Sequence, residues 1–468
     1  MWSRRKILNV YNRIPYWCKE HFSHIFRIIP HKYLLGRDYI STLKLLRETE
    51  FQPVRKLVDF QNSELREVLL HSYRSTIYCK RKMDEKGISD KDILRSPLEV
   101  LRELEFTDKN LIRDNFREFL SDTRDSVAYD YCSTGGTSGE PFYFYIDSNR
   151  SARERAFFVD MWSRIGYKPT CKRVSFRGHR IRRKGWQDDW IRRDRKFSSF
   201  KLTDEYLESM WPKLCEFEPE FIYAYPSTAI TLCQYIERYN KTIPGRLKAL
   251  LLGSENIYNG QREFIEEVTG KRAFLWYGHS EKLVLAGECE YTSHYHAYPQ
   301  YGFIEFINSS GEAAKPGEFA EIVGTGFVNT VMPFIRYRTG DYCTYLGDSC
   351  PECGRNYPIF SDVKGRWTQE FLYGVKGNSI CMSAINVHSN TMVNVFRFQF
   401  FQSKPGEAIL RLLPRKGFTE GDRIRIENEF NGKLDDSVKV SAVVVDDIPL
   451  TERGKFKFID QHINLNNN

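Results

Sequence analysis

Apolar residues recur at helical spacing in the first quarter of the chain and in short runs afterwards. Between residues 41 and 120, apolar side chains stand three or four positions apart with charged residues between them, which predicts a mostly helical segment. Residues 121–270 alternate short apolar runs with amphipathic stretches, as where FIYA precedes PSTAITLCQYIERY. This alternation predicts an α/β domain with parallel sheet character, in which ligands bind at the carboxyl ends of the strands.

The pattern changes twice towards the C-terminus. After about residue 295 the chain becomes rich in strand-like runs, such as YGFIEFI and AEIVGTGF. Beyond Gly365-Arg366 the pattern predicts a small α+β domain, with EGDRIRIENEFNGKL as a helix between strands. We therefore predict a large domain over residues 1–366 and a small one over residues 367–468, since 468 residues exceed one ordinary core.

Composition narrows the class of protein. The apolar fraction of 41% and the charged fraction of 28% are those of a soluble globular protein, and no apolar run reaches the length of a membrane span. The N-terminus lacks a clean apolar run followed by a small-residue cleavage site, which argues against a secretory signal. Eleven scattered cysteines, an odd number, indicate mostly free thiols in a reducing compartment. We predict a cytoplasmic enzyme.

The net charge of +9 is distributed unevenly. Residues 177–196 concentrate Lys and Arg with two Trp, which fits either an anion or nucleic-acid patch or a solvated face paired with nearby Asp. Residues 1–40 mix basic and aromatic residues, which fits peripheral contact with the inner face of a membrane, although Pro15 and Pro30 argue against one long amphipathic helix. Nucleic acid is the less favoured partner, and we expect none.

A loop of glycines and hydroxyls, YCSTGGTSGEPF, spans residues 131–142 between two strand-like runs. A hairpin tip of this composition can turn its backbone N–H groups inward, and its glycines allow close approach of a ligand. Such a tip suits triphosphate oxygens, but it lacks the Gly-Lys-Ser/Thr ending and the following helix of a Walker loop. A plain turn is the alternative.

Cysteine and histidine spacing suggests a metal site. Cys350 and Cys353 form a Cys-x-x-Cys knuckle, and GECEYTSHYH supplies Cys289, His294 and His296. A knuckle with one distant Cys and one His provides the four tetrahedral ligands of a structural zinc ion. Free thiols in a loop are the alternative.

Four further stretches follow the glycine loop in order: LLLGSENI, WYGHSE, FIRYRTGDY and LTERGKFKF. Together they resemble the motif series of the adenylate-forming superfamily of acyl- and aryl-CoA synthetases. The most similar branch is phenylacetate–CoA ligase-like, and within it the capsular polysaccharide biosynthesis proteins. The resemblance covers residues from about 55 to 460 and implies a large α/β domain with mixed sheets followed by a small mobile α+β domain.

The resemblance also implies a nucleotide site. The loop would hold the β- and γ-phosphates of ATP, Tyr277 would lie against adenine, and Asp341 would accept hydrogen bonds from the ribose hydroxyls. The implied nucleotide-binding set also contains Thr134, Gly135, Gly136, Thr137, Ser138, Gly139, Gly253, Ser254, Glu255, Gly278, His279 and Ser280.

Three residues would carry the chemistry. Glu281 matches the carboxylate that holds Mg²⁺, a hard cation that prefers oxygen ligands. Arg338 would sit close to the site, with a carboxylate or a phosphate as its partner. Lys455 matches a mobile lysine that bridges the substrate carboxylate and the α-phosphate, where its charge offsets the charge that develops during attack. The acid would pack against Tyr225, Pro226 and Ser227 and against the loop after Glu281.

The resemblance selects zinc ligands and shows departures. Relatives with a similar cluster place a histidine seven residues after the first cysteine, which selects Cys289, His296, Cys350 and Cys353; Cys343 or His294 could substitute. Glu140 stands where relatives often have a lysine beside the phosphates, and Gln369 and Glu370 follow the hinge instead of the usual Asp or Lys.

These features predict an ATP- and Mg²⁺-dependent ligase that forms an acyl-adenylate. It would transfer the acyl group to a thiol such as CoA, to an amine, or to a hydroxyl, with a lipid-linked glycan as one acceptor. The first alternative is a weakly catalytic or non-catalytic nucleotide-binding relative in a surface-glycan pathway. The second is a basic nucleic-acid-binding protein.

Overall fold

The structure is a computed structural model that describes residues 31–134, 142–179, 181, 185–190, 192–258, 260–365, 371–381, 385, 390–392, 394–415, 417–448 and 458–463. Several predicted site residues lie outside this part of the chain: Gly135, Gly136, Thr137, Ser138, Gly139 and Lys455. The boundary predicted at residue 366, with Gln369 and Glu370, also lies outside it and stays a prediction.

Helices form the first part of the described chain, as predicted for residues 41–120. Several caps are satisfied by side chains: Thr76 accepts the N–H of Cys79, and Asp108 accepts the N–H groups of Asn110 and Leu111. The elements are α4 (His31–Thr49), α5 (Val54–Ser75), α6 (Ile77–Glu85), α7 (Asp90–Arg95), α8 (Pro97–Glu103), α9 (Lys109–Asp114) and the 3₁₀ turns η1 (Phe116–Phe119) and η2 (Arg124–Ser126).

A twelve-stranded sheet forms the centre of the large domain, in the order β11-β12-β13-β14-β10-β9-β8-β7-β6-β3-β5-β4. Neighbours from β5 to β8 pair in parallel, which confirms the predicted parallel character, and the strand-rich part after residue 295 pairs antiparallel. The strands are β3 (Arg173–Phe176), β4 (Trp186–Asp189), β5 (Asp194–Phe197), β6 (Phe221–Ala224), β7 (Ala249–Gly253), β8 (Arg272–Gly278), β9 (Leu285–Glu288), β10 (Tyr295–Ala297), β11 (Gly302–Ile307), β12 (Phe319–Gly326), β13 (Tyr337–Gly347) and β14 (Ile359–Lys364).

Both faces of the parallel strands are covered, so their side chains alternate between two apolar clusters. In β7, Leu250 and Leu252 pack with helices α11–α13, whereas Ala249 and Leu251 pack with α10. This burial on both faces explains the continuous apolar run ALLL in the sequence. The covering helices are α10 (Arg150–Ser163), α11 (Asp204–Phe217), α12 (Pro226–Arg238) and α13 (Gln261–Thr269).

The glycine loop connects two strands, as predicted. β1 (Tyr129–Thr134) pairs antiparallel with β2 (Phe142–Asp147), and Thr134 stands opposite Phe142 at the last described pair. The hairpin therefore delivers the loop at its tip.

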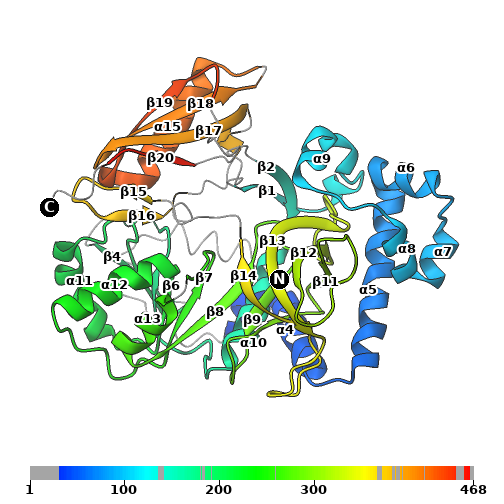
Figure 1. Ribbon diagram of the computed structural model, residues 1–468, viewed down its shortest axis with the longest axis horizontal. Coiled ribbons are helices and arrows are strands. Elements are labelled where there is room, and N and C mark those ends of the chain that lie inside the picture. The colour runs from blue at the N-terminus through cyan, green and yellow to red at the C-terminus, as the bar shows by residue number, and fades with distance from the viewer. Residues whose placement is uncertain are drawn as a thin grey trace.

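The C-terminal region forms a separate α+β unit with its own apolar core (Figure 1). A four-stranded sheet in the order β19-β18-β17-β20 packs against α15 (Glu420–Leu434), and β15 pairs with β16. Phe200 and Tyr225 of the large domain contribute to this core, and Tyr143 of β2 packs against it. The remaining elements are β15 (Phe371–Tyr373), β16 (Ser379–Cys381), η3 (Asn390–Met392), β17 (Val395–Lys404), β18 (Glu407–Pro414), η4 (Asp435–Ser437), β19 (Lys439–Val444) and β20 (Ile459–Gln461).

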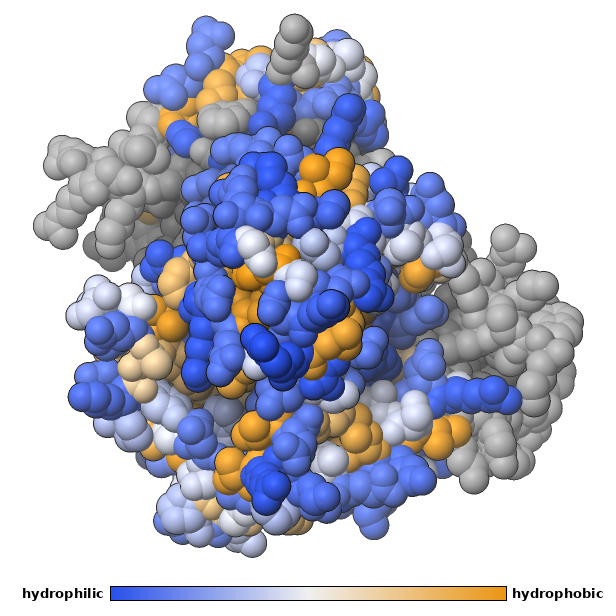
Figure 2. Space-filling model, turned by 90° about the vertical axis from the view of Figure 1, so that its right-hand side faces the viewer, coloured by the Kyte–Doolittle hydropathy of each residue, from blue (hydrophilic) through white to orange (hydrophobic). Residues whose placement is uncertain are grey.

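Among the described residues, none of the helices combines the length and the apolar character needed to cross a membrane. Figure 2 shows one face, on which hydrophilic residues predominate and apolar ones form interrupted spots. Residues 1–30, most of the segment predicted to contact a membrane, lie outside the described chain.

Candidate active site

The carboxyl ends of the parallel strands open into a cleft with a volume of about 1160 Å³. Tyr225 follows β6, Ser254 follows β7, and Tyr277 lies near the end of β8. Parallel neighbours end at the same side of a sheet, so these three residues line the same cleft. Asp341 of β13 reaches the same cleft from the antiparallel half. The fold thus brings together motifs that stand far apart in the sequence.

Tyr277 and Asp341 are joined directly. The phenol of Tyr277 donates a hydrogen bond of 2.9 Å to Oδ2 of Asp341. Burial, and then the charge of Asp341, raise the pKa of Tyr277 well above its ordinary value, so the phenol keeps its proton and acts as the donor. The carboxylate keeps acceptor capacity for further hydroxyls.

Glu281 presents an ionised carboxylate to the cleft. Nε2 of His279 accepts the N–H of Val284, so Nδ1 carries the proton and donates it to Oε2 of Glu281 at 3.1 Å. The phenol of Tyr337 donates to Oε1, also at 3.1 Å. Burial alone raises the pKa of Glu281, but the hydrogen bonds from His279 and Tyr337 outweigh it and hold that pKa below its ordinary value.

Glycines of the neighbouring strands fix the segment after Glu281. A Cβ atom added to Gly302 of β11 would lie 2.2 Å from the carbonyl oxygen of Leu283. A Cβ atom added to Gly324 of β12 would lie 2.9 Å from Cβ of Leu283. Both positions therefore need glycine for close packing of Leu283. This packing holds Glu281, two residues earlier, against the edge of the cleft.

The structure assembles most of the predicted site residues that it describes. The predicted residues that line the cleft are Tyr225, Ser254, Glu255, Tyr277, Gly278, His279, Ser280, Glu281 and Asp341. Gly253 lies beneath Trp276, whose indole leaves no room for a Cβ atom. Pro226 and Ser227 open α12, and the N–H of Ser227 donates to Oε2 of Glu255 at 3.0 Å.

Arg338 lies outside the wall of the cleft as the described residues define it. Its guanidinium forms an ion pair of 2.5 Å with Glu321 of β12, and half of its side chain is exposed. Its partner is therefore one of the two kinds expected, a carboxylate. Its catalytic role stays a prediction.

Several wall residues were not predicted from the sequence. Trp276 and Phe158 meet edge to face at 4.8 Å, and Arg177 lies between aromatic rings. Trp276 stands within the WYGHSE motif, and Arg177 within the basic stretch, so each had a signal in the sequence. Neither signal shows that the side chain faces the cleft.

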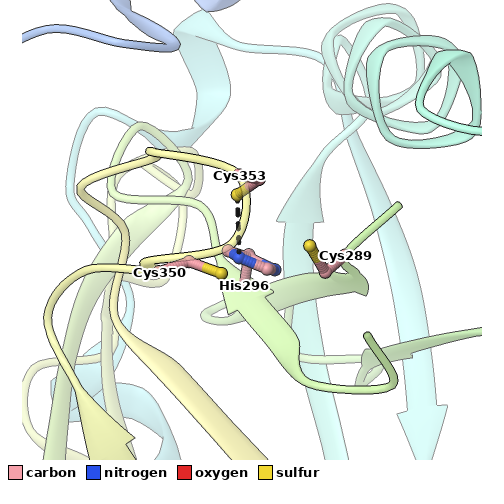
Figure 3. Close-up of side chains that lie close together, drawn as sticks. All are labelled: Cys289, His296, Cys350 and Cys353. Carbon is pink, nitrogen blue, oxygen red and sulfur yellow. Dashed lines mark hydrogen bonds between the residues drawn. The ribbon is translucent and has the colours of Figure 1, made fainter. Parts of the chain in front are cut away.

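Four potential zinc ligands lie close together beside the antiparallel strands β9, β10 and β14. Cys289 follows β9 and His296 belongs to β10, whereas Cys350 and Cys353 come from the turn between β13 and β14 (Figure 3). Their ligand atoms all lie within 4.8 Å of one another, and Nε2 of His296 is 3.4 Å from Sγ of Cys353.

The chemistry of this cluster fits zinc. Ligands of a tetrahedral zinc ion stand roughly 3.3–3.8 Å apart, so only small movements would be needed. Burial lowers the pKa of His296, so its imidazole is neutral, which is the form that binds a metal ion. His294 is not in the cluster; its carbonyl accepts the N–H of Cys289.

Comparisons with known proteins show which families the chain resembles. Residues 372–462 match the family model of the CapK C-terminal domain. Protein CapK of Staphylococcus aureus is 22% identical over 442 residues, which cover 91% of this chain and 93% of that protein. Phenylacetate-coenzyme A ligase of Pseudomonas putida is 26% identical over 321 residues, which cover 64% of this chain and 70% of that enzyme.

Solved structures share the fold. A 2-hydroxyisobutyryl-CoA ligase in complex with 2-HIB-AMP and CoA, in its thioesterification state, superposes with a TM-score of 0.59 at 17% identity. The match covers 89% of this chain and 92% of that one. The same enzyme in its postadenylation state with R3-HIB-AMP gives a TM-score of 0.56 at 18% identity, over 88% and 91% of the two chains.

Proposed function

We propose that this chain, a member of the phenylacetate–CoA ligase-like branch of the adenylate-forming superfamily, activates a carboxylic acid with ATP and transfers the acyl group to an acceptor. The observation that carries the proposal is one cleft that holds both the Tyr277–Asp341 pair and the ionised carboxylate of Glu281. A carboxylate for ribose, a ring for adenine and a carboxylate for a hard cation are the groups that such a reaction needs.

In the first step, an oxygen of the acid attacks the α-phosphorus of ATP. A bond forms between that oxygen and phosphorus, the bond to the β-phosphate bridging oxygen breaks, and pyrophosphate leaves. Asp341 would fix the ribose and Tyr277 the base, so that the α-phosphorus lies within reach of the acid. A Mg²⁺ ion bound to Glu281 would neutralise phosphate charge. Lys455 would stabilise charge on the α-phosphate.

In the second step, the sulfur, nitrogen or oxygen of the acceptor attacks the acyl carbon and the acceptor loses a proton to solvent. The bond between the acyl carbon and the phosphate oxygen breaks, and AMP leaves with its electron pair. A thiol, an amine or a hydroxyl satisfies this chemistry, and CoA is the acceptor named for the ligases that this chain resembles. The small domain carries Lys455 in the sequence, so movement of that domain between steps fits the two-domain plan.

We assign a structural zinc ion to Cys289, His296, Cys350 and Cys353. Four protein ligands leave no open position, so the ion would hold the β13–β14 turn against β9 and β10 and take no part in catalysis. ATP, Mg²⁺ and zinc are then the bound groups.

A role in capsular or other surface-polysaccharide synthesis is the finer proposal, with a lipid-linked glycan as one acceptor. It is supported by the similarity to protein CapK and by the family of residues 372–462. The basic and aromatic residues 1–40 would bring the enzyme to the inner face of the membrane in such a pathway.

Release of pyrophosphate, measured over a broad panel of carboxylic acids, tests the function. The proposal expects signal with at least one acid and its loss in Lys455→Ala and in Asp341→Ala. If no acid gives signal while ATP still binds, the chain is instead a non-catalytic nucleotide-binding relative. Glu140→Lys adds a cation beside the predicted phosphate loop, so a faster reaction would support that loop as the phosphate site.

A further inference from the structure

Among the described residues of the basic stretch 177–196, Arg177 differs from the basic residues that pair with an acid. Arg195, Arg192 and Lys196 pair with Asp188 or Asp189, as expected for the paired alternative, although Arg195 is buried instead of solvated. Arg177 has no ion pair with any described residue, although it lines the cleft. A guanidinium is always charged at physiological pH, so Arg177 contributes a full positive charge to this wall of the cleft.

Neutral groups hold Arg177 firmly in place. Its Nη1 donates to the carbonyl oxygens of Gly253 at 2.9 Å and Ala224 at 3.4 Å, and its Nη2 donates to the hydroxyl of Ser254 at 2.8 Å. The guanidinium also lies over the ring of Tyr225 at 4.1 Å and that of Tyr223 at 4.6 Å. Three of its five N–H groups are therefore used within the described residues, and Nε–H and one N–H of Nη2 remain.

Arg177 and Tyr277 come from different strands of the sheet. Arg177 directly follows β3, and Tyr277 ends β8; the strands β6 and β7 lie between these two strands. The guanidinium of Arg177 extends across the ends of β6 and β7, and it lies 5.9 Å from the ring of Trp276, the residue before Tyr277. Tyr225, predicted to contact the acid, is the ring on which Arg177 stacks.

We propose that the acid activated by this enzyme carries a second anionic group, a carboxylate, and that Arg177 binds it. This inference rests on the proposed function and names its substrate class. A fixed guanidinium with unused donors matches a carboxylate in charge and geometry. A purely apolar acyl chain would bury the cation without a partner, so the same residue would select against monocarboxylic acids.

Matched pairs of acids test the proposal through pyrophosphate release. Hexanoate is compared with hexanedioate, and benzoate with benzene-1,3-dicarboxylate, in wild type and in Arg177→Gln. We expect wild type to prefer the diacid of at least one pair. Arg177→Gln should lower kcat/KM for that diacid by about 10- to 100-fold, and its monoacid partner should lose less than twofold.

Two control variants separate charge from structure. Arg177→Lys keeps the charge but loses the fork of donors, so its preference should lie between those of wild type and Arg177→Gln. Arg192→Gln removes a paired, exposed arginine of the same stretch and should leave the preference unchanged. Thermal melting of all three variants shows whether each remains folded.

The outcomes are distinct. Preference for monoacids in wild type, or an equal loss of both acids in Arg177→Gln, would overturn the substrate class while the proposed function stands. If Arg177→Gln raises the KM for ATP and leaves the acid preference unchanged, Arg177 binds a phosphate of ATP, and the proposed substrate class is overturned as well. Absence of pyrophosphate release with every acid would remove the proposed function, and with it this inference.

Discussion

The phenol of Tyr277 and the carboxylate of Asp341 form a 2.9 Å hydrogen bond across the cleft, although they come from different halves of the central sheet. Tyr277 ends the parallel strand β8, and Asp341 lies in the antiparallel strand β13. The bond therefore links the predicted adenine contact to the predicted ribose contact. The bond holds both side chains in position before ATP binds, which reduces the entropy that is lost when ATP orders them.

Tyr277→Phe should weaken ATP binding by about three- to tenfold, because it removes the donor and keeps the ring. Asp341→Asn should cost more, since the charged acceptor for the ribose is lost. The two effects should be less than additive in the double variant, because both break the same bond. The KM for ATP measures all three, and Tyr239→Phe is the control: it removes a similar bond to Asp204 on the surface. Strict additivity would show that the two residues act independently.

Gly302→Ala should disturb the segment that carries Glu281. The added methyl group would lie 2.2 Å from the carbonyl oxygen of Leu283, so the backbone must move. We expect adenylation to fall by tenfold or more, with a smaller change in the KM for the acid. Gly245→Ala meets nothing within 4 Å and should behave as wild type. Full activity of Gly302→Ala would mean that this packing does not position Glu281.

Sequence patterns predicted the strand and helix order because burial on two faces leaves a clear signature, as in the apolar run of β7. They also identified the cysteine knuckle, since ligand spacing follows from the geometry of zinc. They could not show which of the described basic residues of the stretch 177–196 have acidic partners. The pairing of β4 with β5 determines which of these residues lie beside Asp188 and Asp189.

The roles of two glycines also could not be predicted from the sequence, because they depend on contacts with another segment. Gly302 and Gly324 stand in ordinary strand-like runs, and their importance depends on Leu283, which arrives from a distant segment. The choice between His294 and His296 likewise depends on how β10 lies beside β9, where His296 stands opposite Gly287. Local spacing alone contains neither fact.

The contact between the two domains should depend more on packing than on charge. Phe200 is buried in the core of the small domain, so Phe200→Ala should lower the free energy of unfolding by about 3 kcal/mol. Lys201 pairs with Asp435 at 2.7 Å, but both side chains are about one-third exposed, so Lys201→Ala should cost less than about 1 kcal/mol. Urea unfolding compares the two variants, and equal losses would contradict this order.

Asp422 should give α15 a stability that depends on pH. Hydrogen bonds, first from Asn394 and then from the capping box with Thr419, lower the pKa of Asp422 to about 2. A lowered pKa contributes stability that is present above the unfolded pKa of about 4 and is lost as the pH falls towards 2. Asp422→Ala should therefore be less stable than wild type by about 1–2 kcal/mol at pH 7. Melting temperatures from pH 7 to 3.5 should show the difference constant down to about pH 5 and smaller below pH 4; a constant difference would be the contrary result.

Cys353→Ser should remove the zinc ion and the stability that it provides. Three remaining ligands bind zinc less tightly, and the turn between β13 and β14 would lose its attachment to β9 and β10. Wild type should contain about one zinc ion per chain by elemental analysis, and the variant much less, with a lower melting temperature. Cys215→Ser is the matched control, because Cys215 is also half-buried but belongs to α11, away from the cluster. A strong chelator should lower the melting temperature of wild type and of Cys215→Ser to that of Cys353→Ser, which it should leave almost unchanged. Wild-type protein without stoichiometric metal, or equal melting temperatures before and after chelation, would refute the site.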